Sequence, residues 1–245
     1  MELLNSLVGQ INDILWSYVL IILLIGAGII FTIRTKFVQI RFIKEMIRLI
    51  AGDAGNKMEG QQISSFQAFC VSTASRVGVG NIAGIAIAVV LGGPGAIFWM
   101  WIIAILGSAT GFVESTLAQI YKVPRTDSNG YLGGPAYYIN NALHSPKTAV
   151  FFAILISVTY GLIFNSVQSN TISLSLQTAF NFDATMIGIV IAVFSGIVVF
   201  GGLHRIAKVT EYMVPIMAGI YLLIAFAITI YNISELPTVL SVIFK

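Results

Sequence analysis

The feature that most restricts the fold of this chain is a run of 37 residues, 77–113, without a charged side chain. Only 9% of the 245 residues are charged and 57% are hydrophobic, whereas about a quarter of the residues in a soluble domain are charged. So few charges cannot cover a water-exposed surface. Because a backbone in lipid must satisfy its own hydrogen bonds, and about 20 apolar residues span a bilayer as a helix, we predict an all-α integral membrane protein.

Charge and cysteine content exclude other classes of protein. The single cysteine, Cys70, rules out a disulfide-stabilised scaffold. The net charge is only +3, and the basic residues are gathered in a few short stretches. This distribution indicates membrane topology and not nucleic-acid binding. The sequence has no phosphate-binding loop, metal cluster or nucleophile with its base, so we expect neither an enzyme nor an organic cofactor.

Six transmembrane helices account for the uncharged runs. Residues 14–33 form the first, since 20 uncharged residues at about 1.5 Å each match a bilayer core of ~30 Å. A Gly-Gly-Pro-Gly sequence at 92–95 divides the longest run into two helices. The other five predicted helices comprise residues 65–91, 96–121, 148–182, 184–203 and 212–234.

Between the first two spans, residues 36–50 have the pattern of an amphipathic helix. Arg41, Lys44 and Arg48 fall on one helical face, and apolar side chains occupy the other. A calmodulin-type target helix has the same pattern. Beside a membrane span, however, this pattern is more often an interfacial anchor, and we predict that the segment lies at the bilayer surface.

The basic residues predict the orientation in the plasma membrane. Segments 34–62, 122–147 and 203–208 hold 11 of the 13 basic residues, and the loops on the opposite side hold only Lys245. Because cytoplasmic loops are enriched in Lys and Arg, we predict that these three segments are cytoplasmic. With six spans, the N-terminus is then outside.

The most informative segment for function is 72–84, which lies within a predicted span yet contains several glycines. Gly78 and Gly80 make local unwinding cheap, since glycine costs a helix interior about 1 kcal/mol. Unwinding would free amide groups for an anion and carbonyl groups for Na⁺, as in the broken helices of secondary transporters. Tight packing through Gly80 and Gly84 is an equally good explanation on composition alone. Arg76 favours the binding site, because a charge at this depth is costly.

Two adjacent motifs carry a family resemblance. Residues 76–84 (RVGVGNIAG) and 92–101 (GGPGAIFWMW) resemble the signature of the alanine or glycine:cation symporter family, the sodium:alanine symporters. Segments 130–138, 164–171 and 205–215 are similar to further motifs of the family. The resemblance implies the leucine-transporter fold, with two inverted repeats of five helices. It also implies Na⁺-coupled uptake of a small neutral amino acid such as alanine or glycine.

This chain departs from the family pattern in two respects. The family usually carries threonine where this chain has Val79, which puts substrate preference in doubt. Family members also have about eleven helices, whereas six are predicted here. By resemblance, residues 1–245 are a single membrane domain, with residues 65–234 as the first five-helix repeat. The second repeat is absent and is the expected partner, so the chain resembles the N-terminal half of a transporter.

The resemblance also suggests roles for individual residues. Gly78, Val79 and Gly80 would offer backbone groups to an amino acid's carboxylate. Asn81 would offer its amide oxygen to the substrate or to Na⁺. The Ala74 and Val77 carbonyls would be Na⁺ ligands of the first repeat, since hard cations take oxygen ligands.

Polar residues in two other spans are candidates for binding or for structure. Asn165, Gln168 and Ser169 fall on one helical face. We expect Gln168 to contact the substrate, with hydrogen bonding between helices as the alternative. Glu114 lies within the third span, and we expect it to pair with Arg76 or with freed amides, because an unpaired charge in a membrane is costly.

Two other functions remain open. The protein could be a proton-coupled amino-acid carrier of the same fold, or a membrane channel subunit. The sequence has no repeated pore motif, which favours a carrier embedded in the lipid bilayer.

The predicted topology can be tested by cysteine labelling. A cysteine at position 234 should react with an impermeant reagent from outside, and one at position 128 only from inside, because the basic segments are predicted to be cytoplasmic. Labelling of both positions from the same side would contradict the six-span topology.

Overall fold

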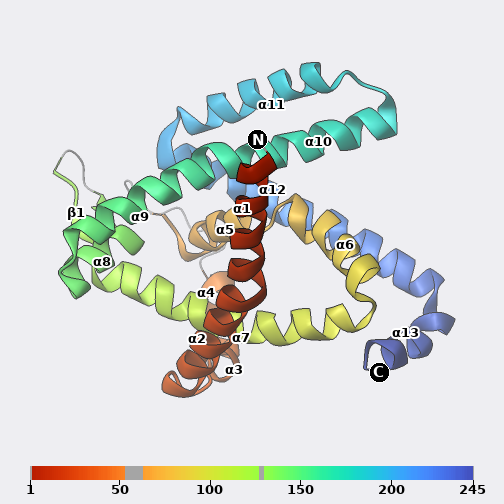
Figure 1. The fold of residues 1–245 in the computed structure, drawn as a ribbon, viewed down its shortest axis with the longest axis horizontal. Coiled ribbons are helices and arrows are strands. Elements are labelled where there is room, and N and C mark those ends of the chain that lie inside the picture. The colour runs from red at the N-terminus through yellow and green to blue at the C-terminus, as the bar shows by residue number, and fades with distance from the viewer. Residues whose placement is uncertain (1, 53–62, 127–129, 245) are drawn as a thin grey trace.

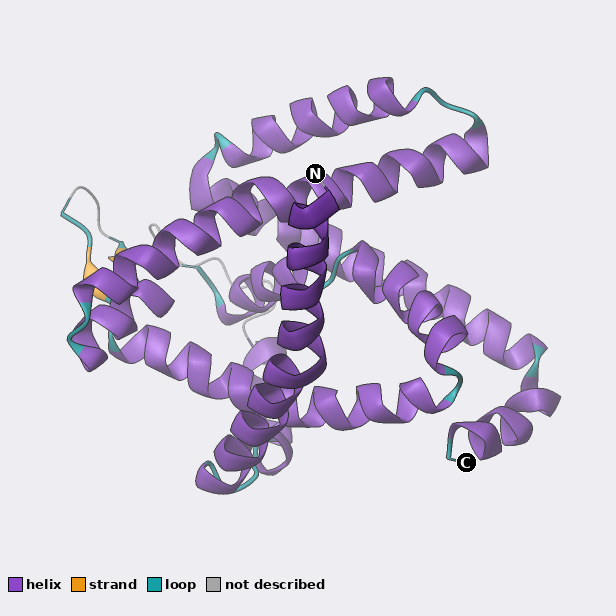
Figure 2. Ribbon diagram, viewed as in Figure 1, coloured by secondary structure: helices purple, strands orange, loops and turns teal. Residues whose placement is uncertain are grey.

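The structure is a computed structural model that describes residues 2–52, 63–126 and 130–244. Residues 53–62 of the first basic segment, and Ser128, lie outside the described residues. Apart from turns, loops and one short hairpin, these described residues are helical (Figures 1 and 2). The helices before the long third span are α1 (Glu2–Ile14), η1 (Leu15–Val19), α2 (Leu20–Arg34), α3 (Val38–Arg41), α4 (Ile43–Gly52), α5 (Ser65–Arg76), η2 (Val79–Asn81) and α6 (Ala83–Gly92).

The second part of the chain continues the helical pattern. Its elements are α7 (Gly95–Ile120), β1 (Val123–Pro124), β2 (Tyr131–Leu132), α8 (Pro135–Leu143), α9 (Pro146–Val158), η3 (Thr159–Phe164), α10 (Asn165–Phe180), α11 (Ala184–Val199), α12 (Gly202–Tyr231), η4 (Ile233–Glu235) and α13 (Leu236–Ile243). β1 and β2 pair antiparallel, with Val123 opposite Leu132.

Four helices are long and apolar enough to cross a membrane: Asn5–Arg34, Gly95–Ile120, Pro146–Phe180 and Gly202–Tyr231. Three shorter apolar helices accompany them in the described residues: Ala83–Gly92, Ala184–Val199 and Ile233–Ile243. The prediction of a helical membrane protein is therefore confirmed.

Several predicted boundaries were wrong. The first helix begins at Glu2 and not at residue 14, because polar residues that shorten a membrane span do not prevent a helix. The segment 36–50 is two helices that meet at Phe42, preceded by a sharp turn in which Lys36 and Phe37 both have positive φ (54° and 57°). The last predicted span begins at Gly202, ten residues before 212. The hairpin β1–β2 was not predicted.

The helix ends follow local chemistry. Ser64 and Gln67 form a capping box at the start of α5, in which each side chain bonds the other residue's backbone N–H. The Asp183 side chain accepts a hydrogen bond of 2.8 Å from the Met186 N–H at the start of α11. Between α9 and α10 the helix does not end but passes through one π-helical turn, η3, so that 146–180 is continuous.

The two most extensive helix–helix contacts are α2 on α7 and α5 on α12. Small residues make both possible. Ala109 is fully buried on α7, as are Cys70 on α5 and Ala207 on α12. Most large apolar side chains are exposed, as expected where lipid or further protein covers them. Figure 1 shows α10 and α11 as a hairpin at one side of the molecule, and the two helices are in contact.

The α2–α7 crossing depends on Gly28. A Cβ at this position would lie 2.8 Å from the Leu106 Cβ, whereas nothing lies within 4 Å of a Cβ at Gly26 on the same helix. We expect Gly28→Val to destabilise the protein by about 1–3 kcal/mol through overpacking. Gly26→Val is the matched control and should have a much smaller effect.

The measurement is thermal unfolding of both purified variants in the same detergent. Equal losses of stability in the two variants would show that the close approach of Gly28 to Leu106 adds no specific cost.

Candidate functional site

The second predicted span is broken at the glycines. α5 ends at Arg76, and Val77 and Gly78 have extended backbones, with φ/ψ of −97°/106° and −129°/−171°. One 3₁₀ turn, η2, follows before α6 begins at Ala83. The unwinding expected from Gly78 and Gly80 is therefore observed.

Asn81 stabilises the shape of this break. Its side-chain Oδ1 accepts a hydrogen bond of 3.0 Å from the Gly78 N–H, and its own N–H donates to the Gly78 carbonyl at 3.0 Å. The Gly78 amide therefore turns away from the Ala74 carbonyl, which it would meet in a continuous helix. The Asn81 side chain thus has a backbone-capping role in this structure.

The break leaves carbonyl groups without partners. Val77 N–H donates to the Thr73 carbonyl at 2.8 Å, which completes the last regular turn of α5. Within the described residues, nothing donates to the carbonyls of Ala74 or Val77. These are the two carbonyls that the sequence suggested as Na⁺ ligands. Both residues are exposed, so these carbonyls are free to accept a hydrogen bond or to coordinate a cation.

Gln168 on α10 contacts the break directly. Its Oε1 accepts a hydrogen bond of 2.9 Å from the Val79 N–H. The Gln168 amide can come this close only because residue 78 is a glycine. A Cβ at Gly78 would lie 2.7 Å from Gln168 Nε2 and 3.1 Å from Oε1. The sequence suggested both Gln168 and the break, but it gave no signal for this contact between residues 89 positions apart.

Gly80 differs from Gly78 in its surroundings. No atom lies within 4 Å of a Cβ built at Gly80, and the residue is exposed. Its N–H makes no hydrogen bond within the described part of the chain. The break therefore presents one occupied amide, at Val79, next to one free amide, at Gly80.

The polar face of α10 borders a large cavity. This cavity of about 930 Å³ lies between α10 and α11, and Asn165, Gln168 and Ser169 line it together with Ser195. Asn165 Nδ2 donates to the Gly161 carbonyl of its own helix at 3.3 Å. The structure thus brings Gln168 to the break and leaves Asn165 farther along the cavity.

The predicted pairing of Arg76 with Glu114 is not made in this structure. Arg76 donates to the Ser72 hydroxyl one turn earlier in α5. An ion pair is made instead by Arg48 and Glu45 on α4. Burial raises the pKa of the Tyr138 phenol on α8, and the nearby Glu114 carboxylate raises it further. Glu114 is therefore close enough to α8 to act on Tyr138 electrostatically.

A polar link between α5 and α12 was not predicted. Gln67 Nε2 donates to Glu211 Oε2 at 2.9 Å, which joins the helix before the break to the last long helix. Gln67 also closes the capping box at Ser64, so one side chain both begins α5 and fixes it against α12.

Comparisons with known proteins agree on one family. The model described as "Sodium:alanine symporter family" matches residues 1–245. In Bacillus subtilis, the "Probable sodium/glutamine symporter GlnT" is 52% identical over 244 residues, and the "Amino-acid carrier protein AlsT" is 49% identical over 242. The "Sodium/alanine symporter AgcS" of Methanococcus maripaludis is 36% identical over 245 residues.

These matches cover 98–100% of this chain but only 50%, 50% and 54% of the three relatives. The chain therefore spans about half the length of the curated relatives that it matches.

The contact of Gln168 with the break can be measured by a double-mutant cycle. Gly78→Ala should displace the Gln168 amide, and Gln168→Ala should remove it. Each should therefore cost about 1 kcal/mol through loss of the Val79 hydrogen bond. The double variant should cost less than the sum, because both changes break one contact. Gly80→Ala is the control, since the space there is open. Additive costs in equilibrium unfolding would contradict the contact.

Proposed function

Because the chain belongs to the sodium:alanine symporter family, whose members are transporters and not enzymes, we propose that it is the N-terminal half of a Na⁺-coupled symporter for a small neutral amino acid. Alanine and glycine are the proposed substrates. The observation that carries this proposal is the break between α5 and α6. Its backbone has both a free amide and free carbonyl groups, and Gln168 contacts it directly.

We further propose that the chain crosses the membrane six times, with its N-terminus outside. Four helices are each long and apolar enough to supply one of these crossings. In this proposal α5 and α6 together make the second span, and α11 makes the fifth. Residues 65–234 would then be the first five-helix repeat of a leucine-transporter fold, and the remaining half of the relatives' length would supply the second.

The free amide of Gly80 is the proposed anchor for the substrate carboxylate. Amides at the start of a half-helix attract an anion, because the helix dipole favours negative charge there. The Val79 amide would join it once the Gln168 oxygen moves away, since a carboxylate oxygen is a stronger acceptor than an amide oxygen. Gln168 would then be free to accept from the substrate ammonium.

Na⁺ would bind on the other side of the break. The Ala74 and Val77 carbonyls have no partner in the described residues, and the Asn81 Oδ1 keeps a second lone pair beyond the Gly78 bond. Hard cations take six or more oxygens in many sites, so further ligands are expected from the second repeat. Na⁺ is transported with the substrate and is not a resident cofactor.

A second candidate substrate is glutamine. The relative that is 52% identical is named a sodium/glutamine symporter, whereas the one named a sodium/alanine symporter is 36% identical. Val79 also lacks the hydroxyl of the family's usual threonine. Competition by unlabelled alanine, glycine and glutamine against one labelled substrate separates these candidates.

The proposed function is tested by uptake of labelled alanine into proteoliposomes that contain the full-length protein, with and without an inward Na⁺ gradient. Gly80→Leu should abolish uptake, because its side chain would cover the free amide while the open space lets the protein fold. Asn81→Ala should raise the Na⁺ concentration for half-maximal uptake several-fold. Gln168→Ala should raise the alanine concentration for half-maximal uptake several-fold. Val79→Thr should be tolerated.

The matched control is Gly84→Leu, which also meets open space but lies beyond the break in α6. Uptake is normalised to folded protein in every case. Normal turnover in Gly80→Leu, with an unchanged Na⁺ response in Asn81→Ala, would mean that the break is a packing feature. Uptake driven by a proton gradient alone would indicate the proton-coupled carrier, and current without coupled uptake would indicate a channel.

A further inference from the structure

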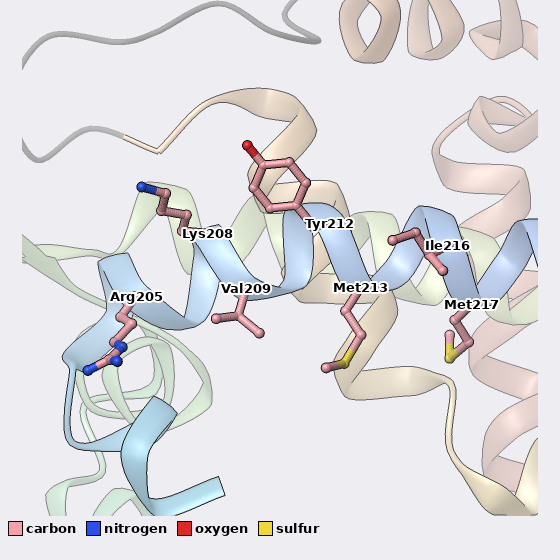
Figure 3. Close-up of a pocket in the computed structure, with 7 residues that line it drawn as sticks. All are labelled: Arg205, Lys208, Val209, Tyr212, Met213, Ile216 and Met217. Atoms are coloured by element: carbon pink, nitrogen blue, oxygen red, sulfur yellow. The ribbon is translucent and has the colours of Figure 1, made fainter. Parts of the chain in front are cut away.

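One face of α12 carries an unpartnered groove that the transport proposal does not use. A cavity of about 670 Å³ runs along this helix, with Arg205 and Lys208 at its start and Met213, Ile216 and Met217 toward its middle. Figure 3 shows these side chains on the α12 ribbon, with Tyr212 between the basic end and the apolar end. The groove itself is lined by apolar atoms, and two basic side chains border one end of it.

This face points away from the protein contacts of α12. Ala207 and Val214 are buried, and Glu211 accepts the bond from Gln67 of α5. These three residues share one side, since they fall at i, i+4 and i+7. At 100° per residue the groove is centred on the opposite side, where Met213 and Ile216 are 60% and 61% exposed.

The residues along α12 also indicate their depth in a bilayer. Tyr212 and Tyr231 bracket residues 213–230, which carry no charge. The two tyrosines are about 29 Å apart along the helix at 1.5 Å per residue, which is about one hydrocarbon core. Tyrosine is enriched at both membrane–water interfaces. Lys208 and Arg205, about one and two turns beyond Tyr212, therefore fall at headgroup level.

The charges at this level have no protein counter-ion in the part of the chain that the structure describes. Neither Arg205 nor Lys208 makes an ion pair or a hydrogen bond there. Glu211, the nearest acid in sequence, is engaged by Gln67. Two cations at headgroup level attract the phosphate of an anionic lipid.

A second groove adjoins the same arginine. This cavity of about 650 Å³ is lined by Arg205 and by α11 side chains that include Ala192, Val193 and Ile197. Phe200, at the turn between the two helices, is 95% exposed. Arg205 thus lies between two apolar grooves, one on α11 and one on α12, which matches one headgroup with two acyl chains.

We propose that this surface binds an anionic diacyl phospholipid. The phosphate lies between Arg205 and Lys208, and the Tyr212 hydroxyl faces the headgroup region. One acyl chain follows Val209, Met213 and Ile216, and the other follows α11. Methionine suits such a surface because its flexible side chain adapts to a mobile chain.

The test is lipid retention by the whole protein, measured by native mass spectrometry in detergent with added phosphatidylglycerol or phosphatidylcholine of identical acyl chains. Arg205→Gln with Lys208→Gln should weaken phosphatidylglycerol binding about 25-fold, since each basic residue near an anionic surface contributes about fivefold. Phosphatidylcholine binding should change little. The matched control, Lys44→Gln with Lys147→Gln, removes two charges elsewhere and should retain the lipid.

The apolar part needs its own variant. Val209→Trp should fill the α12 groove and weaken both lipids several-fold, whereas Leu222→Trp, at an exposed position on another face of the same helix, should not. A photo-reactive side chain at Met213 should form lipid adducts. Equal losses in the Lys44/Lys147 control, no loss in either groove variant, or cross-links from position 213 to another part of the polypeptide would each overturn the proposal.

Discussion

The structure depends on one constraint: a backbone group that leaves its helix inside a membrane needs another partner. The break between α5 and α6 meets this constraint in two ways. Asn81 takes the Gly78 amide, and Gln168 takes the Val79 amide from a separate helix. The Gly80 amide and the Ala74 and Val77 carbonyls are among the backbone groups of the break that have no partner in the described residues. The same accounting of unpaired polar groups leads to both the transport proposal and the lipid site.

Close contact between the helices requires small residues at particular points. Gly28 lets α2 reach Leu106 on α7, and Gly78 lets the Gln168 amide reach the break. In lipid, helices associate through packing and hydrogen bonds and not through the hydrophobic effect. Gln67, which joins α5 to Glu211 on α12, adds a polar contact of the same kind.

Much of the fold was predictable from the sequence, because charge-free runs and glycine clusters are local signals. The division at 92–95 and the unwinding at Gly78 follow from them. The start of the first helix at Glu2 was missed, since polar residues limit a membrane span but not a helix. The Gln168 contact and the Gln67–Glu211 bond join residues 89 and 144 positions apart, and no local pattern encodes such distant pairs. The hairpin β1–β2 is too short to give a strand pattern.

The π-helical turn η3 (Thr159–Phe164) lies immediately before α10. Such a turn contains about one residue more than an α-helical turn, so it advances every later side chain by about 100° around the helix axis. Gln168 lies after η3, so this rotation is part of what points it at the break. The side chains of α9, which begins at Pro146, lie before η3 and are not rotated. The directions in which α9 and α10 present their side chains are therefore set separately, although the two form one continuous helix. If η3 became a regular α-helical turn, α10 would rotate relative to α9. Gln168 would then move away from the Val79 amide, although neither Gln168 nor Val79 had been changed.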